Sequence, residues 1–310
     1  MTTKKIILHV SLFLITFFTS AVAGVAWLNK DPFDLYNISS GLTYAVLILF
    51  ILTCHEFGHY FAARYHGVAA TLPYYIPAPS IPGFLNFGTF GAVIRTKSVI
   101  PSKKVMFDIG VAGPIAGFIA TVGVLMYGFT HLPGKEYILS IHPDYFSHHE
   151  AGGASLQFGP SILYNFFALS LTDPLRDFVP PMSEMYHYPF LCTGWFGLFV
   201  TAMNLIPIGQ LDGGHLSYAM FGEKHKVLSH VAFGGLLLLG LFGVLPAWNI
   251  DTPYGWSGWI FWALVLLFIV KLYHPSVPDE EELDPRRRLI GWLTFAIFII
   301  SFSPNPFNIM

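Results

Sequence analysis

Residues 55–59 read His-Glu-Phe-Gly-His and lie inside a long apolar stretch of the chain. If this stretch is a helix, His55 and His59 lie one turn apart on the same face, so both imidazoles can bind one metal ion. Glu56 would then reach a water molecule on that ion and accept its proton as the water attacks a carbonyl. Burying two histidines and a carboxylate in an apolar helix is costly without such a role, so we predict a catalytic metal site.

A catalytic zinc ion commonly has three protein ligands and one open position, so a third ligand is expected elsewhere in the chain. The best candidate is Asp212, in the segment NLIPIGQLDGG of residues 204–214. Pro207 and Gly209 would break a helix there, and the two glycines after Asp212 allow close backbone approach, so the carboxylate can turn inward. On spacing alone, an ordinary helix cap with Asp212 facing water explains the segment equally well.

Together, the two segments resemble the site-2 protease family of intramembrane zinc metalloproteases, which pair HExxH with NxxPxxxLDG. The resemblance covers most of residues 41–215. It implies one zinc ion per chain, held by three ligands: His55, His59 and Asp212. It also implies that Glu56 is the general base and that Asn204 binds substrate or stabilises the developing oxyanion. A buried asparagine that joins two helices would look the same as Asn204 in the sequence.

Residues 72–97 lie between two apolar stretches and are rich in Pro, Gly and aromatic residues, which is typical of short strands and tight turns. In the family that the chain resembles, the matching segment forms a membrane-associated sheet whose edge pairs with an unwound substrate. Such an edge replaces the hydrogen bonds that a peptide loses when its helix unwinds. We therefore expect substrate contacts from Gly88, Thr89, Phe90 and Gly91. A packed interfacial loop is the alternative.

The composition indicates that these residues work in a membrane. Hydrophobic residues make up 54% of the 310 residues and charged residues only 11%, against about 25% charged in ordinary soluble proteins. Most of the apolar stretches approach or exceed the ~20 residues that cross the hydrocarbon core as a helix. These stretches are residues 6–28, 41–63, 105–130, 187–206, 228–247, 255–272 and 289–303. We predict an all-α polytopic membrane protein with six to seven transmembrane helices and a small β segment near residues 72–97.

Three regions follow from these stretches: an N-terminal span with an outer loop (1–40), a catalytic membrane core (41–220) and C-terminal spans (221–310). The core contains a long outer loop, residues 132–186. Within that loop, the apolar run 156–171 is flanked by Gly-Pro and Asp-Pro pairs, so we expect an interfacial or partly re-entrant helix. A full span there would put Asp212 on the side of the membrane opposite to His55.

The basic residues predict the orientation. With the N-terminus inside, all but three of the 16 basic residues lie on the inner side; the exceptions are Lys30, Lys135 and Arg176. The active site is thus expected toward the cytoplasm, by default of a bacterial inner membrane, although related organellar enzymes keep another membrane open. A cleaved signal peptide is the alternative for the first stretch, because residues 21–23 have the small-x-small pattern.

The expected partners are the lipid bilayer and a transmembrane protein or peptide substrate. No nucleic acid is expected, because the net charge is −2 and no basic stripe with interleaved aromatic residues occurs. Two other functions stay open: a membrane zinc hydrolase acting on a non-protein amide or ester, such as a lipid, and a non-enzymatic transporter or scaffold.

Other polar residues have simpler interpretations. The rival third ligand is Asp108, which a helix cap or a pair with Lys103 or Lys104 would also explain. Cys54 and Cys192 are expected near opposite membrane faces and therefore unpaired. The run PDEEELDPRRR (278–288) is expected to be a solvated linker. The remaining polar cluster lies in the outer loop and could bind a second metal, although a hydrated loop is the favoured interpretation; it comprises His142, His148, His149 and Glu150.

Overall fold

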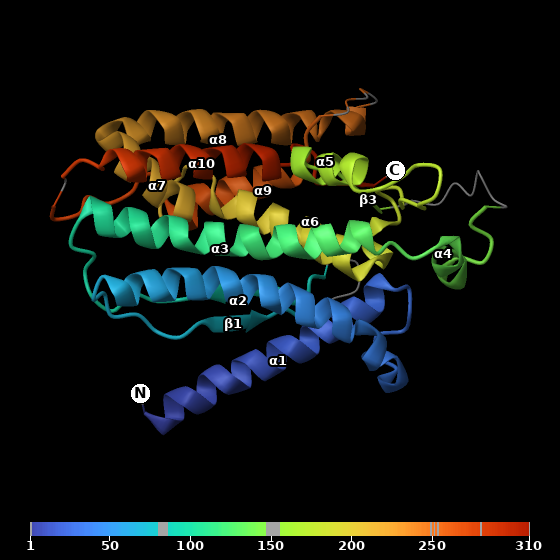
Figure 1. Cartoon of the computed structure of the whole chain (residues 1–310). Coiled ribbons are helices and arrows are strands. Elements are labelled where there is room, and N and C mark those ends of the chain that lie inside the picture. Colours follow the sequence, from blue (N-terminus) through green and yellow to red (C-terminus); the bar gives the residue numbers. More distant parts are fainter. Residues whose placement is uncertain are drawn as a thin grey trace.

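Three long apolar stretches form the helices that the sequence predicts: α1 (Thr3–Trp27), α2 (Leu42–Tyr65) and α3 (Lys103–Thr130). The computed structural model describes residues 2–79, 86–146, 156–248, 250, 252, 254–279 and 281–309. In Figure 1, α2 and α3 lie side by side along the bundle, while α1 crosses obliquely below α2. A short 3-10 helix, η1 (Leu35–Gly41), leads into α2.

The later apolar stretches form shorter or broken helices. Helix α6 (Pro189–Asn204) has 16 residues and α10 (Pro285–Ser301) has 17. Helix α9 (Gly258–Val265) continues into a π-helical turn, η5 (Leu266–Val270). The apolar segment after residue 212 is divided into α7 (Asp212–Phe221), the 3-10 turn η3 (Gly222–Lys224), α8 (His225–Phe242) and the 3-10 turn η4 (Leu245–Trp248).

Among the described residues, four helical segments are long and apolar enough to cross a membrane. They are Thr3–Trp27, Leu35–Tyr65, Lys103–Thr130 and Asp212–Trp248. The protein is therefore a helical membrane protein. Length and composition alone do not confirm six to seven spans, because α6, α9 with η5, and α10 are each shorter than the ~20 residues of a typical crossing helix.

The outer connection contains α4 (Lys135–Ile141), β3 (Leu156–Phe158), α5 (Ile162–Ser170) and the 3-10 turn η2 (Met185–His187). With nine residues, α5 is too short to cross the bilayer, in agreement with the expected interfacial helix. Strand β3 pairs antiparallel with β4 (Phe307–Ile309), a sheet that the sequence did not predict. Its two strands are only three residues each and lie about 150 residues apart, so no local pattern announces their pairing.

The segment expected to form strands near residues 72–97 does so. Strands β1 (Tyr74–Pro77) and β2 (Thr89–Val93) form a two-stranded antiparallel sheet, with Tyr75 opposite Ala92. The Tyr75 hydroxyl lies 2.7 Å from the Thr53 hydroxyl of α2, and this hydrogen bond fixes the sheet beside the helix that carries residues 55–59.

Residues 284–288, the end of the run expected to be a solvated linker, form the start of α10 and its cap. The Asp284 carboxylate caps α10 by accepting hydrogen bonds from the backbone of Arg286 and Arg287. The Arg287 guanidinium in turn makes two hydrogen bonds to Asp108, at 2.8 and 2.6 Å. Asp108 also lies 2.8 Å from His66. Its described partners are therefore Arg287 and His66, which join α10 and the end of α2 to α3, rather than the lysines expected from the sequence.

Small residues let α2, α3 and α6 pack closely. A Cβ atom added at Gly58 of α2 would come within 2.4 Å of the Ala112 carbonyl oxygen of α3, and one added at Gly197 of α6 would come within 2.3 Å of the Thr121 hydroxyl. In a bilayer the lipid is as apolar as the side chains, so this close packing, more than hydrophobic burial, holds helices together. Cys54 and Cys192 are both free, as expected.

Candidate metal centre

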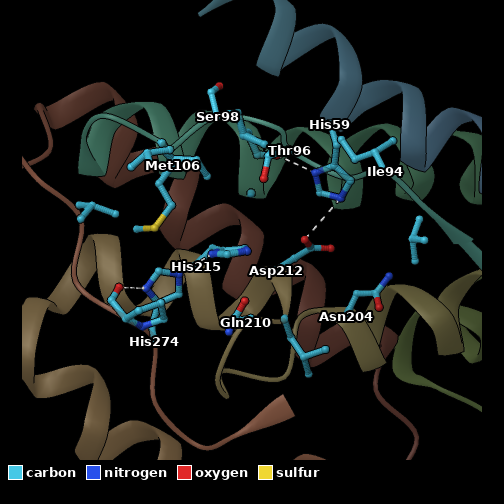
Figure 2. Close-up of a pocket in the computed structure, with 18 of the residues that line it drawn as sticks. His59, Ile94, Thr96, Ser98, Met106, Asn204, Gln210, Asp212, His215 and His274 are labelled. Carbon is cyan, nitrogen blue, oxygen red and sulfur yellow. Dashed lines mark hydrogen bonds and ion pairs between the residues drawn. The ribbon is translucent and has the colours of Figure 1, made fainter. Parts of the chain in front are cut away.

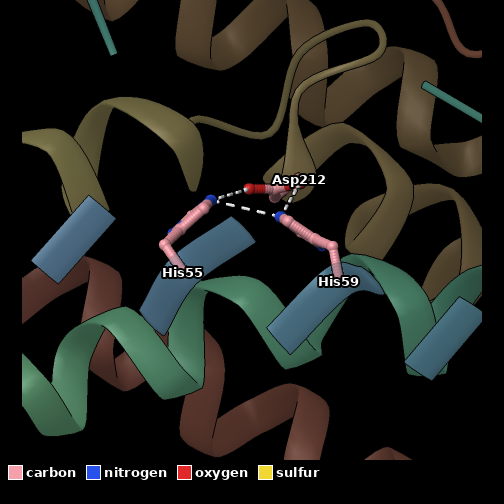
Figure 3. Close-up of side chains that lie close together, drawn as sticks. All are labelled: His55, His59 and Asp212. Carbon is pink, nitrogen blue, oxygen red and sulfur yellow. Dashed lines mark hydrogen bonds and ion pairs between the residues drawn. The ribbon is translucent and has the colours of Figure 1, made fainter. Parts of the chain in front are cut away.

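Three side chains from two distant parts of the chain meet at one point. His55 and His59 of α2 place their Nε2 atoms 3.1 Å apart. The carboxylate of Asp212, the first residue of α7, lies 3.3 Å from His55 Nε2 through Oδ2 and 3.4 Å from His59 Nε2 through Oδ1. Figure 3 shows both rings pointing from α2 toward Asp212.

These distances fit a single metal ion. Ligand atoms about 2.0–2.1 Å from a tetrahedral zinc ion lie about 3.3–3.4 Å from one another. Two imidazoles and one carboxylate are a donor set that zinc accepts, and all three side chains are largely buried. A zinc ion held by these three side chains would keep a fourth position for water or substrate.

Neighbouring groups orient the two rings. His59 Nδ1 lies 2.7 Å from the Ile109 carbonyl of α3, so this nitrogen donates to the backbone and Nε2 is left as the ligand atom. Asn204, the last residue of α6, has its side-chain nitrogen 3.3 Å from His55 Nε2. The asparagine that the resemblance implicates thus lies directly beside His55.

Asp212 can reach His55 and His59 because α6 and α7 are separated by a buried non-helical segment. Gly209 has φ +58°, a conformation that glycine adopts readily. A Cβ at Gly213 would come within 2.0 Å of the Leu205 carbonyl oxygen, so glycine is required there as well. The polar backbone of the break is satisfied: the Gly209 amide donates to Leu272, and the Pro207 carbonyl accepts from Ser229.

Glycines of α3 make room for the histidine rings. A Cβ at Gly113 would come within 2.1 Å of His59 Nε2, and one at Gly117 would lie 3.1 Å from His55 Nδ1. These two glycines of α3 therefore help to determine where the histidine rings lie.

Replacing Gly113 with alanine is expected to lower zinc affinity by about 10–100-fold, the usual cost of disturbing residues that orient metal ligands. The added methyl group would collide with His59 and turn its ring away from Asp212. Gly123→Ala on the same helix is the matched control, because no described atom lies within 4 Å of the added Cβ. Zinc titration of both variants checks this prediction; equal affinities would show that α3 does not constrain the ring.

The side chains of His55, His59 and Asp212 line a cavity of about 510 Å³. Glu56 lines it too, is 6% exposed, and accepts a hydrogen bond from the backbone of Ile94. Residues 92–94, at the end of β2 and just beyond it, form part of the wall. Figure 2 shows Ile94 and Thr96 on the same side of the cavity as His59, and Asn204 and Gln210 across from them.

Gly88, Thr89, Phe90 and Gly91 do not line this cavity as the structure describes it. Gly88 instead packs against α1, where an added Cβ would come within 2.3 Å of Ser20. The Phe90 side chain is 73% exposed. The part of this strand that lines the cavity with Glu56 is therefore residues 92–94, and substrate contact by Gly88 to Gly91 stays a prediction.

Two further histidines line the cavity, and neither belongs to the HExxH or the NxxPxxxLDG motif. His215 Nδ1 lies 2.7 Å from His274 Nε2, and both line the cavity, where Figure 2 shows them side by side. Burial, together with the adjacent His215, lowers the pKa of His274 to about 4, so this ring is neutral at physiological pH. Asp108, the rival ligand, is not in the group of residues 55, 59 and 212, because it pairs with Arg287 and His66.

Comparisons with known proteins agree with this geometry. The family model described as "Peptidase family M50" matches residues 43–245. "Probable zinc metalloprotease EGY2, chloroplastic" from Oryza sativa subsp. indica is 27% identical over 303 residues, which cover 95% of this chain and 49% of that protein. "Probable zinc metalloprotease EGY1, chloroplastic" from Oryza sativa subsp. japonica is 32% identical over 272 residues, which cover 87% and 41%. The chain thus spans about half the length of these curated relatives.

The matched residues include the whole of the candidate site, from His55 to Asp212, and make up more than half of the chain. The relatives are named zinc metalloproteases, which agrees with the donor set of the site. The resemblance predicted from the two motifs is confirmed: this chain belongs to peptidase family M50, the site-2 protease family.

Proposed function

We propose that the protein is an intramembrane zinc endopeptidase that hydrolyses peptide bonds of membrane-tethered substrates within or near the bilayer. The observation that carries this proposal is the meeting of His55, His59 and Asp212 around one point in a cavity that Glu56 also lines. His55, His59 and Asp212 would hold the zinc ion. When bound, zinc makes water a nucleophile at neutral pH and polarises the carbonyl that is attacked.

The protein's own residues supply the proton transfers. Glu56 accepts the proton of the attacking water and passes it to the amine that leaves as the peptide bond breaks. Asn204 donates a hydrogen bond from its side-chain nitrogen to the carbonyl oxygen as negative charge develops on it. The position of Asn204 beside His55 supports this role.

The strand formed by β2 and residue 94 would hold the substrate in an extended conformation. The sheet has two strands, so each strand has one edge that no other described strand covers. We assign substrate contacts to this strand, from Gly88 to Gly91 where the substrate enters, and through residues 92–94 beside Glu56. Backbone pairing along such an edge would stabilise the peptide after its helix unwinds.

We further propose that six to seven segments cross the bilayer, in three regions: 1–40, the catalytic core 41–220, and 221–310. Short helices such as α6 and α10 can span if the bilayer thins locally. The N-terminal ends of α3 and α10 lie together through the pair Asp108–Arg287, next to Lys103 and Lys104. This basic end supports a cytoplasmic active site, which we assign to a bacterial inner membrane; a chloroplast membrane, as in the names of the relatives, is the alternative.

The proposal is tested by reconstituting the purified chain in liposomes with peptides that each contain one transmembrane segment. We expect cleavage within or near the segment, its loss on removal of zinc with a chelator, and its return when zinc is restored. Lipid amides and esters are incubated in parallel. Turnover of those lipids without cleavage of any transmembrane peptide would instead indicate a hydrolase for non-protein substrates.

A further inference from the structure

A second group of potential metal ligands lies where α1 and α3 end and α6 begins, at the end of the bundle opposite to the start of α3 (Figure 1). It consists of His142, at the end of α4, and Glu184 and His187, which flank and form the 3-10 turn before α6. Of the loop cluster expected from the sequence, only His142 belongs to this group; residues 148–150 lie outside the described residues.

The ligand atoms of this second group are arranged like those of the catalytic centre. The Nε2 atoms of His142 and His187 are 2.9 Å apart. The Glu184 Oε2 atom lies 3.4 Å from His142 Nε2 and 3.3 Å from His187 Nε2. All three atoms therefore point at one another at nearly the spacing of about 3.3–3.4 Å that ligands of one tetrahedral zinc ion adopt.

His142 and His187 lie within hydrogen-bond distance of each other, but neither makes a hydrogen bond to Glu184 Oε2. Glu184 Oε2 is buried and has no hydrogen-bond donor among the residues that the structure describes. A buried carboxylate oxygen without a donor is costly, and a cation is one way to compensate it. The two imidazole nitrogens facing this oxygen are the ligand type that zinc prefers beside a carboxylate.

The surroundings also prepare His187 to be a ligand. Its Nδ1 atom lies 2.6 Å from the Trp27 carbonyl at the end of α1, so Nδ1 donates to the backbone and Nε2 keeps its lone pair for a metal. In the catalytic centre, His59 has the same arrangement with the carbonyl of Ile109. The Tyr137 hydroxyl of α4 donates to the His187 carbonyl at 2.6 Å, which holds α4 against this turn.

An ion can enter this group from one side. The side chain of His187 is 1% exposed and that of Glu184 17%, whereas the side chain of His142 is 34% exposed. The inner two ligands are thus preformed in the protein, and His142 closes the site from the loop. A water molecule can fill the fourth position.

We propose that His142, Glu184 and His187 form a second, non-catalytic site for a divalent cation of the zinc type. The ion would tie the outer connection to the ends of α1 and α6, and it would be bound independently of the zinc at His55, His59 and Asp212. Because the second site stands apart from Glu56 and the cavity, its loss should leave peptide cleavage unchanged.

The test counts zinc in the purified chain after dialysis against buffered free zinc. The wild type is expected to bind one ion more than His142→Gln and than the nearly isosteric Glu184→Gln, and both variants should keep the catalytic ion and the cleavage activity. His131→Gln is the matched control. His131 directly follows α3, at the end of the bundle where the second group lies, but it contacts Tyr127 rather than Glu184 or His187.

Retention of the catalytic ion shows that a variant has folded, so the zinc count separates loss of the second ion from loss of the fold. If His142→Gln does not fold, Glu184→Gln decides the question. A wild-type chain that binds only one zinc ion would overturn the inference, because the group would then hold a shared proton instead of a metal. A folded variant that still binds as much zinc as the wild type would overturn it too.

Discussion

Replacing Glu56 with glutamine is expected to lower the rate of peptide hydrolysis by about 10²–10⁴-fold, the usual contribution of a general base, while zinc stays bound. Glutamine has nearly the same shape as glutamate but cannot take a proton from the attacking water. The ligands His55, His59 and Asp212 are unchanged, so the metal should remain. Single-turnover cleavage of a reconstituted transmembrane peptide, with the zinc content measured on the same sample, checks both parts.

A matched control is Glu223→Gln, which removes an exposed carboxylate that pairs with Lys226 and does not line the cavity. It should cleave at the wild-type rate. If Glu56→Gln were as active as this control, Glu56 would not be the general base. If it lost zinc as well as activity, its effect would be on the metal site rather than on proton transfer.

Replacing Asp212 with alanine is expected to reduce zinc affinity by more than the about 10–100-fold that residues supporting the ligands contribute, and to abolish cleavage at ordinary zinc concentrations. The substitution leaves only the two imidazoles of α2, and it leaves them without the carboxylate that lies 3.3 and 3.4 Å away. Competition with a chelator of known affinity measures the loss, and excess zinc should restore part of the activity.

The sequence offers both Asp212 and Asp108 as the third zinc ligand, and the substitution Asp108→Asn distinguishes between them. Asp108 contacts Arg287 and His66, so its substitution should weaken the contact between α3 and α10 and lower the thermal stability, with zinc affinity unchanged. Weak zinc binding in Asp108→Asn together with normal binding in Asp212→Ala would assign the third ligand to Asp108 and refute the site described above.

The histidine pair of the candidate metal centre could be predicted from the sequence because it obeys strong local rules. His55 and His59 lie four residues apart on one helix, and their burial in an apolar stretch has no inexpensive structural explanation. The break at Pro207 and Gly209 before Asp212 is visible in the same way, because few residue types can end a helix inside a membrane.

Features that depend on contacts between distant segments could not be predicted. Nothing in the sequence near Glu184 or His187 indicates that His142 comes within 3.4 Å of them, because that contact depends on how α4 folds back on the start of α6. The pairing of Asp108 with Arg287 was missed for the same reason, since 179 residues separate the two. Nearby lysines were the more obvious partners.

The sequence could not identify which residues of β2 line the cavity beside Glu56. The Gly88–Gly91 segment has the glycines that mark a turn or an irregular strand, and Gly88 and Gly91 both have positive φ. Gly88 packs against α1, whereas a Cβ added at Gly91 would meet nothing within 4 Å. The residues beside Glu56 are the ordinary ones that follow, and only the position of α2 identifies them.

The most direct test is an anomalous-scattering map of the zinc-loaded protein, recorded at the zinc absorption edge. The account predicts a peak about 2.0–2.2 Å from Nε2 of His55, Nε2 of His59 and a carboxylate oxygen of Asp212, with room beside Glu56 for one water molecule. A fully loaded protein with no zinc between these three side chains, or with Asp212 beyond coordinating distance of the ion, would contradict it.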